Sequence, residues 1–347
     1  MNDPIDLYVG CYTLKLSEEL DGKGPGIVLA NYDPQARSLT ARLVAKQRNP
    51  TYLTMHPTLS VLYAVEELAL SDEPRVFAYQ IEADGGLTLL NSQPVHGAFS
   101  CHLAVIQNHL LVANYGSGNV DTYPLGAKGR LEEPLPITQH IGSGPNPQRQ
   151  EGPHAHMVMA FNDELIYVAD LGIDRCKAYQ LAESGLLERP ALDLRLPAGS
   201  GPRHLVRHPQ LPIAYVLTEL SGEVIAFQVG ETTDQIQEVR FFPEGTSGIP
   251  SGASIRIDAE GRFLWVSERT SSTLTQFAIG DDGSLRHYHT YQLEDRTPRD
   301  FDLIGPWLIV AGQDSNTLSF WEQGKDDVWE CRSTHRDVMT PSCVVGR

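Results

Sequence analysis

The chain has 347 residues, of which 41% are apolar and 20% charged, and its formal net charge is −17. These values are typical of a globular protein with a sizeable core, and the acidic balance argues against nucleic acid or an anionic membrane surface as a partner. Residues 1–6 lack the basic start and apolar run of a signal peptide, and the five cysteines form no C-x-x-C pair. We therefore expect a cytoplasmic protein with no disulfide or zinc framework.

One apolar segment recurs seven times along the chain. Each copy is short, rich in β-branched or aromatic residues and bounded by polar residues, glycine or proline, which is typical of a buried strand. The copies are residues 7–9, 62–65, 110–113, 166–169, 214–217, 264–266 and 308–311. A second segment after each copy alternates in strand fashion toward an aromatic residue. These aromatic residues are Tyr32, Tyr79, Tyr123, Tyr179, Phe227, Phe277 and Trp321.

A third element precedes each apolar segment from the second unit onward, and polar segments such as 87–90 and 285–288 supply a fourth strand. Seven such units without helical periodicity predict an all-β fold, a seven-bladed β-propeller with four antiparallel strands per blade. No linker is visible, so we predict a single domain over residues 1–347. The first unit lacks its opening strand, and we expect residues 340–345 to complete that blade and close the ring without a free edge.

The predicted blades place two sets of residues at one mouth of the central channel, because the start of the first strand and the end of the second lie on the same face. The residues that follow an opening proline or its equivalent are Thr51, His102, His154, Arg203, Arg299 and Ser342. The residues that follow the second strand are Tyr12, Glu67, Tyr115, Leu171, Glu219, Arg269 and Gln313. Convergent arginines, histidines and glutamates in a concave place predict a small-molecule site.

Several of these residues also have simpler interpretations. Arg203 and Glu219 can be a buried ion pair with a purely structural role. His154 and His156 lie close together on one strand, and we expect only one of them to face the channel. His102, His154 and Glu219 can be drawn as a metal-binding set, but three nearby arginines would oppose a divalent cation, so we predict no metal and no cofactor.

Motifs throughout the chain carry a resemblance to a known family. They are Asn49–Leu53 with His56-Pro57, Asn114–Val120, Gly152–His156, Ala169–Arg175, Gly201–His204 with Glu219-Leu220, Pro298–Phe301 and Ala311–Ser315. With these motifs in order, the sequence from about Tyr8 to Val345 resembles the seven-bladed propeller lactonases. That family includes bacterial 6-phosphogluconolactonases and fungal carboxy-cis,cis-muconate cyclases. Residues 268–272 and 311–313 look more like the bacterial branch.

The resemblance implies a catalytic set of His154, Arg203, Glu219 and Arg269, and the hydrolysis of a sugar-derived lactone such as 6-phosphogluconolactone. This reaction needs an activated water, a stabilised oxyanion and a protonated leaving group. Glu219 or His154 can act as the base or acid, and the arginines can hold the oxyanion or an anionic tail. The expected substrate-binding residues are His102, His204, Arg299, Gln313, Glu67 and Tyr115.

No Ser-His-Asp constellation or G-x-S-x-G elbow is apparent, so we expect no covalent intermediate. Two other function classes stay open at this point. One is a muconate-lactone cycloisomerase that uses the same residues, and the other is a non-catalytic ligand-binding or scaffold propeller. The expected partner is a small anionic sugar lactone, and the expected state is a monomer or weak homodimer.

Overall fold

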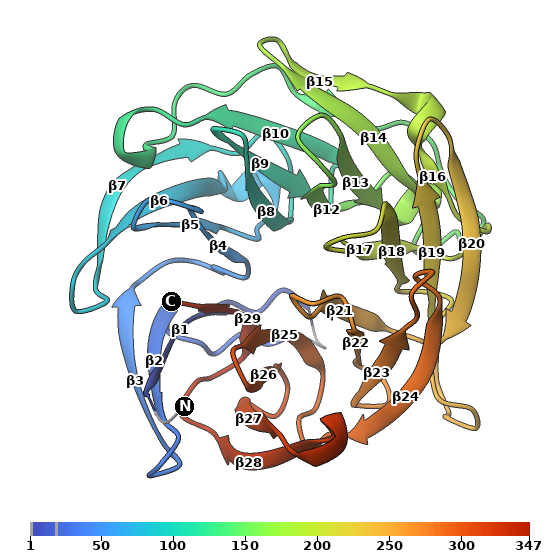
Figure 1. Cartoon of the computed structure of the whole chain (residues 1–347). Helices are drawn as coiled ribbons and strands as arrows, with labels where there is room; N and C mark the ends of the chain where they lie inside the picture. Colours follow the sequence, from blue (N-terminus) through green and yellow to red (C-terminus); the bar gives the residue numbers. More distant parts are fainter. Residues whose placement is uncertain (1–2, 18–19) are drawn as a thin grey trace.

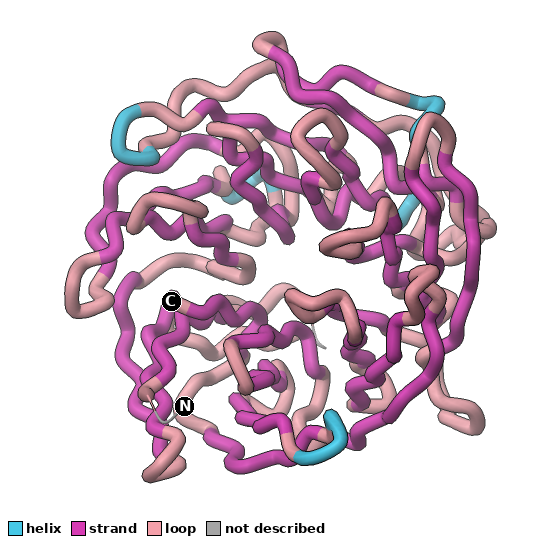
Figure 2. The backbone as a smooth tube through the Cα atoms, in the orientation of Figure 1, coloured by secondary structure: helices cyan, strands magenta, loops and turns pink. Residues whose placement is uncertain are grey.

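The computed structural model describes residues 3–17 and 20–347, which form seven β-sheets arranged as a ring of blades (Figure 1). Each blade is an antiparallel sheet whose first strand lies nearest the central axis and whose fourth lies at the rim. The tube view shows how little of the chain is helical (Figure 2). The predicted seven-bladed β-propeller with four strands per blade is confirmed. None of the helices in the described residues has the length and apolar character needed to cross a membrane.

Within each blade the strands follow one another from the axis outward. Blade 1 contains β29 (Pro341–Gly346), β1 (Ile5–Cys11), β2 (Ile27–Asp33) and β3 (Ser38–Ala45), and blade 2 contains β4 (Leu53–Met55), β5 (Val61–Val65), β6 (Arg75–Ile81) and β7 (Leu87–Pro94). Blade 3 contains β8 (Ser100–Ile106), β9 (His109–Asn114), β10 (Asn119–Pro124) and β11 (Thr138–Gln139). Blade 4 contains β12 (Ala155–Ala160), β13 (Ile166–Asp170), β14 (Arg175–Ala182) and β15 (Gly185–Glu188), and a fifth strand, β16 (Leu194–Arg195), also pairs with β14.

Blade 5 contains β17 (Pro202–Arg207), β18 (Ile213–Thr218), β19 (Glu223–Val229) and β20 (Thr233–Arg240), and blade 6 contains β21 (Gly252–Ile257), β22 (Phe263–Glu268), β23 (Thr273–Ile279) and β24 (Leu285–Gln292). Blade 7 contains β25 (Pro298–Ile304), β26 (Trp307–Gly312), β27 (Thr317–Gln323) and β28 (Trp329–His335). Short 3₁₀ turns are η1 (Leu70–Asp72), η2 (Ala127–Gly129), η3 (Leu171–Ile173), η4 (Pro190–Leu192) and η5 (Lys325–Asp327).

The seven apolar segments found in the sequence form the second strands of the blades, and these strands are buried along almost their whole length. Their side chains pack between neighbouring blades. Between blades 7 and 1, for example, Ile309 and Phe320 pack in one cluster with Val9 and Tyr32, and the Tyr32 and Phe320 rings stack with centroids 3.8 Å apart. Each fully buried aliphatic or aromatic side chain contributes about 1.5–3 kcal/mol. The blade-to-blade contacts therefore form the core of the ring.

The chain ends close the ring inside blade 1. Strand β29 pairs antiparallel with β1, with Val344 opposite Val9, and the Ser342 hydroxyl donates to the Gly10 carbonyl at 3.0 Å. The backbone N–H of Val344 also donates to Asp300 of blade 7 at 3.1 Å. The predicted completion of the first blade by the C-terminal strand is confirmed, and no free edge is left at this joint.

The end of the central axis at which the second strands terminate is called the mouth. In several blades a β-bulge near the start of the first strand determines which side chains point toward it. The register of β17 against β18 shifts between Pro202 and His204, so Arg203 is the extra residue. The same shift makes Arg299, Cys101 and His156 the extra residues of β25, β8 and β12. A bulge re-aims the side chain of its extra residue.

Because of this bulge, two positions predicted from the sequence are wrong by one or two residues. Cys101 and His156, not His102 and His154, are the equivalents of Arg203, because Ser100 and Ala155 occupy the place of the opening proline. His154 lies two residues earlier, in the loop before β12. Both His154 and His156 are buried, and they have different partners: His154 Nδ1 lies 2.9 Å from the Tyr115 carbonyl and His156 Nε2 lies 2.5 Å from Arg203 Nη1. The expectation that only one of them faces the channel stays a prediction.

Candidate active site

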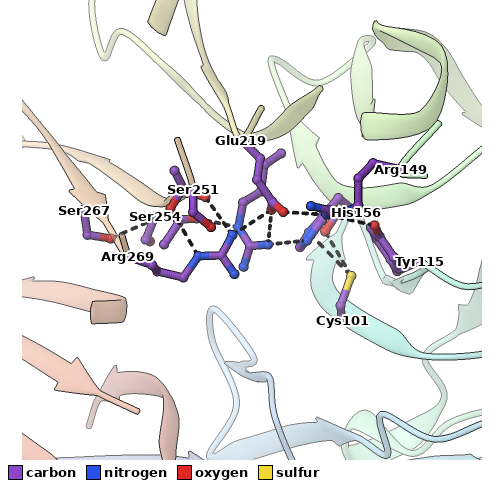
Figure 3. A network of polar contacts seen from close by, with 12 residues as sticks. Cys101, Tyr115, Arg149, His156, Glu219, Ser251, Ser254, Ser267 and Arg269 are labelled. Atoms are coloured by element: carbon purple, nitrogen blue, oxygen red, sulfur yellow. Dashed lines mark hydrogen bonds and ion pairs between the residues drawn. The ribbon is translucent and has the colours of Figure 1, made fainter. Parts of the chain in front are cut away.

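Glu219 lies at the centre of a cluster of three arginines at the mouth (Figure 3). It is the first residue after β18, and its backbone N–H donates to the Gly201 carbonyl at 2.7 Å. Its carboxylate lies 2.7 Å from Arg203 Nη1, 3.0 Å from Arg269 Nη2 and 2.6 Å from Arg149 Nη2. Three charged donors therefore converge on one buried carboxylate, and they come from blades 5 and 6 and from the loop before blade 4.

Arg203 and Arg269 are fixed by backbone carbonyl groups as well as by Glu219. Arg203 Nε donates to the Ala253 carbonyl at 2.8 Å, and its Nη1 also lies 2.5 Å from Nε2 of His156. Arg269 donates to the carbonyls of Ser251 and Gly252, each at 3.2 Å. These contacts lock both guanidinium groups, which is the preorganisation that an anion-binding site requires.

Arg149 reaches the cluster from the irregular segment 142–150. Its Nη2 donates to Glu219 and, at 3.1 Å, to the hydroxyl of Tyr115. The next residue, Gln150, is fully buried and donates to the Leu171 carbonyl at 2.8 Å and to Asp174 at 2.7 Å. The backbone under Arg149 is therefore anchored, although the segment has no regular secondary structure.

The arginines control the protonation of Glu219. Burial alone would raise the pKa of this carboxyl group, but the charges of Arg269, Arg203 and Arg149 outweigh burial and hold its pKa well below the ordinary value. Burial also lowers the pKa of Arg269 to about 10, which still leaves it charged at neutral pH. Three positive charges minus one negative charge give the cluster a net charge of +2.

His154 lies beside this cluster, with its ring stacked on that of Tyr115 at a centroid distance of 4.5 Å. Its Nδ1 is 2.9 Å from the Tyr115 carbonyl, which can only accept, so Nδ1 carries a proton. Its Nε2 faces the exposed Glu151 side chain at 3.1 Å. The segment before His154 packs closely against η3. A Cβ on Gly172 would lie 1.9 Å from the Gly152 carbonyl oxygen, so position 172 requires a glycine.

Three other histidines line the axis below the mouth as neutral groups. Burial lowers the pKa of His102 to about 3, and it lowers the pKa values of His156 and His204 well below the ordinary range. The lone pair of His156 Nε2 accepts from Arg203, because an arginine can only donate. His204 Nδ1 is buried without a partner among the described residues, and the His204 side chain is among those that surround a small cavity with Tyr52 and Arg203.

Glu67 and Arg299 form a second group at the mouth, on blades 2 and 7, and they line one small cavity together with Arg203. The Glu67 carboxylate accepts from the Tyr12 hydroxyl at 2.9 Å and from the Thr51 hydroxyl at 2.6 Å. The guanidinium carbon of Arg299 lies over the Tyr12 ring at 5.0 Å from its centroid. The neighbouring Gln313 donates to Asp314 at 2.9 Å, while its buried carbonyl oxygen has no partner in the described part of the chain.

The structure thus brings Arg203, Glu219 and Arg269 into direct contact and places Tyr115 and His154 next to them. Of the other expected substrate-binding residues, Glu67, Arg299 and Gln313 lie in or beside the second group at the mouth, and His102 and His204 lie deeper along the axis. In residues 3–17 and 20–347, no three His, Cys, Asp or Glu side chains gather as metal ligands, so the hypothetical set of His102, His154 and Glu219 does not form.

Sequence reasoning missed Arg149 and His156. The repeat gives no signal for Arg149, which acts from an irregular segment and contacts a residue 70 positions away in the sequence. His156 was visible as part of the Gly152–His156 motif, but its position became clear only with the bulge in β12.

A ring of blades whose mouth holds a cationic cluster around a buried carboxylate, with an imidazole beside it, has the features of a small-molecule site. Residues 6–345 match the family described as lactonase, 7-bladed beta-propeller. The chain belongs to this family, and it is a lactonase and not a non-catalytic scaffold.

Named relatives agree with this assignment. The chain is 33% identical to a 6-phosphogluconolactonase of Bacillus subtilis, over 97% of this chain and 94% of that protein. It is 29% identical to a 6-phosphogluconolactonase of Erwinia tasmaniensis, over 79% and 80% of the two chains. Among solved structures, the periplasmic gluconolactonase of Pseudomonas aeruginosa superposes with a TM-score of 0.91 at 27% identity, covering 99% of both chains.

Proposed function

We propose that this lactonase hydrolyses 6-phosphogluconolactone to 6-phosphogluconate. The names of the curated relatives support a sugar lactone as substrate. The observation that favours a phosphorylated substrate is the net charge of +2 on the cluster of Glu219 with Arg149, Arg203 and Arg269. A phosphate monoester carries about −1.5 to −2 charges at neutral pH, so the two are electrostatically complementary. An uncharged lactone would leave those two charges without a counterion.

The reaction adds water across the ester bond of the ring. A water oxygen attacks the carbonyl carbon, a general base takes a proton from that water, and negative charge develops on the carbonyl oxygen. The ring C–O bond then breaks, and the departing ring oxygen takes up a proton. Arg203 and Arg269 can stabilise the oxyanion, because their guanidinium groups are already fixed by backbone carbonyls.

His154 is the better of the two candidate bases. Three arginines depress the pKa of Glu219, which makes its carboxylate a weak base, and the role we assign to Glu219 is to gather the arginines. In neutral His154 the contact of Nδ1 with the Tyr115 carbonyl leaves the lone pair on Nε2. The 3.1 Å contact of Nε2 with the Glu151 carboxylate needs a proton on Nε2, so the exposed Glu151 side chain has to turn away before Nε2 can accept a proton from water. The same ring can return the proton to the leaving ring oxygen.

A covalent intermediate finds no support at this site. The cysteine nearest the arginines, Cys101, is buried, and burial raises the pKa of its thiol, so it is protonated at neutral pH. Its sulfur lies 3.5 Å from Nδ1 of His156 and 3.4 Å from the His156 carbonyl. These contacts suit a neutral structural thiol and not a nucleophile.

The test compares three substrates with purified wild-type protein and with His154→Asn. The asparagine amide can keep the hydrogen bond to the Tyr115 carbonyl while removing the Nε2 base. We expect the highest kcat/KM on 6-phosphogluconolactone, less on glucono-δ-lactone and none on a muconolactone, each corrected for spontaneous hydrolysis. His154→Asn should lower kcat by roughly two to four powers of ten with little change in Tm.

Two outcomes would overturn parts of this proposal. Turnover of a muconolactone that exceeds turnover of the sugar lactones would replace the proposed reaction with a cycloisomerase activity. A well-folded His154→Asn protein with near-normal kcat would remove His154 as the base while leaving the substrate assignment in place.

A further inference from the structure

Arg149 differs from the other two arginines of the cluster in how it is held. Its side chain is 39% exposed, against 5% for Arg203 and 14% for Arg269. Arg203 and Arg269 each donate to at least one backbone carbonyl, whereas the Arg149 side chain donates hydrogen bonds only to Glu219 and the Tyr115 hydroxyl among the described residues. Both contacts use Nη2.

The free side of this guanidinium is available to a ligand. Nε and Nη1 of Arg149 donate no hydrogen bond to any described residue. A guanidinium presents its donors in a planar fork that matches two oxygens of a phosphate. Because the backbone at Gln150 is anchored, the side chain can change its direction by rotation of its own bonds, without movement of the segment 142–150.

Glu219 stays compensated when Arg149 turns toward a ligand. Arg203 and Arg269 still contact its Oε2, so the carboxylate keeps two charged donors. Neither of these two can leave as readily, since each would also give up its own side-chain hydrogen bonds to backbone carbonyls. Arg149 is therefore the one arginine of the cluster that can turn toward a substrate anion without leaving Glu219 uncompensated.

We propose that Arg149 is the specificity-determining residue that binds the phosphate of the substrate and separates phosphorylated from unphosphorylated sugar lactones. This inference rests on the proposed function, because it assigns the phosphate of that substrate to one side chain. In the complex, Nε and Nη1 donate to phosphate oxygens, while Arg203 and Arg269 remain with Glu219 near the lactone carbonyl.

The experiment measures kcat/KM for 6-phosphogluconolactone and for glucono-δ-lactone in wild type, Arg149→Gln and Arg149→Lys. Arg149→Gln should reduce kcat/KM for the phosphorylated lactone by roughly 10- to 100-fold, the usual effect of losing charged hydrogen bonds. The value for glucono-δ-lactone should fall far less, so the ratio of the two values drops roughly tenfold or more. Arg149→Lys keeps the charge without the fork and should fall between wild type and Arg149→Gln.

Arg296→Gln is the matched control. It removes an exposed arginine from the same mouth, where Arg296 donates to the Asp314 carbonyl at 3.1 Å and does not contact Glu219. It should leave both kcat/KM values as in wild type. Inorganic phosphate as a competitive inhibitor gives a second readout, and its inhibition constant should rise in Arg149→Gln and not in Arg296→Gln.

The possible failures can be told apart. A wild type without preference for the phosphorylated lactone would contradict the proposed function itself. A wild-type preference that survives unchanged in Arg149→Gln would overturn only the role of Arg149. Equal losses on both substrates, together with a lower Tm, would show that Arg149 acts only as a structural partner of Glu219.

Discussion

Two glutamates occupy the same position in different blades, yet the structure surrounds them differently. Glu67 and Glu219 each follow the second strand of their blade, β5 and β18. Glu219 receives three guanidinium groups, whereas Glu67 receives the hydroxyls of Tyr12 and Thr51. The repeat determines the position of each carboxylate in its blade, and the neighbouring residues determine whether it accepts hydroxyl hydrogen bonds or pairs with arginines.

The first strand shows where the difference originates. Thr51 occupies in blade 2 the place that Arg203 occupies in blade 5, and each side chain contacts the glutamate of its own blade. A threonine gives a neutral hydrogen bond to the carboxylate, while an arginine adds charge. The residue at this repeated position is therefore one source of the difference, and Arg149 and Arg269 supply the rest of the charge around Glu219.

The largest expected effect comes from Glu219→Gln. This change leaves three buried or half-buried guanidinium groups without a counterion, and removing one partner of a buried ion pair costs about 3–5 kcal/mol. We expect the free energy of unfolding at pH 7 to fall by that amount in chemical denaturation, and lactonase activity to fall with it because the arginines lose their common anchor. A Glu219→Gln protein with wild-type stability and activity would contradict the organising role of Glu219.

Acid titration gives the control for this variant. The pKa of Glu219 is lower in the folded protein than its unfolded value near 4.3, so the unfolded chain binds more protons in acid. The stability that the carboxylate contributes is present above pH of about 4.3 and is lost as the pH falls through the folded pKa. The difference in unfolding free energy between wild type and Glu219→Gln should therefore shrink below about pH 4.

A smaller effect is expected from Arg203→Lys. One ammonium group can contact Glu219, but it cannot also donate to the Ala253 carbonyl and to His156 as the arginine does. We expect kcat/KM for the sugar lactone to fall by roughly 10- to 100-fold with only a modest fall in Tm. Arg75→Lys, which alters a guanidinium bound to Ser92 on blade 2, is the control and should leave kcat/KM unchanged. Equal kinetics in Arg203→Lys and wild type would show that charge alone suffices at this position.

The smallest effect is expected from Glu67→Gln. The amide oxygen can still accept a hydroxyl hydrogen bond, and no ion pair is broken, so the unfolding free energy should fall by only about 1–2 kcal/mol. The unfolding free energies of Glu67→Gln, Glu219→Gln and wild type, measured by thermal or denaturant unfolding under the same conditions, give this comparison. If the two glutamine variants lose equal stability, their different surroundings do not matter and the contrast between the blades is wrong.

The repeat made most of the fold predictable. The seven second strands are continuous apolar segments because neighbouring blades cover both of their faces, and the missing first strand at the N-terminus had an obvious replacement at residues 340–345. The same regularity predicted that Arg203, Glu219 and Arg269 would lie at one mouth, because the strand ends of the blades converge there, and the structure brings the three into contact.

The remaining parts of the site do not follow from periodicity. A bulge inserts one residue without changing the apolar pattern, so the exchange of His102 for Cys101 and of His154 for His156 was invisible in the sequence. Arg149 comes from an irregular segment whose path is set by the buried contacts of Gln150, and no local pattern indicates where such a side chain points.

A crystal structure with bound 6-phosphogluconate would show which residues of the mouth hold the substrate. We expect the phosphate to lie within hydrogen-bond distance of Arg149. The sugar-acid carboxylate, which forms from the lactone carbonyl, should lie between His154 and the pair Arg203 and Arg269. A ligand bound instead beside Glu67 and Arg299, with the Glu219 cluster untouched, would contradict this expectation.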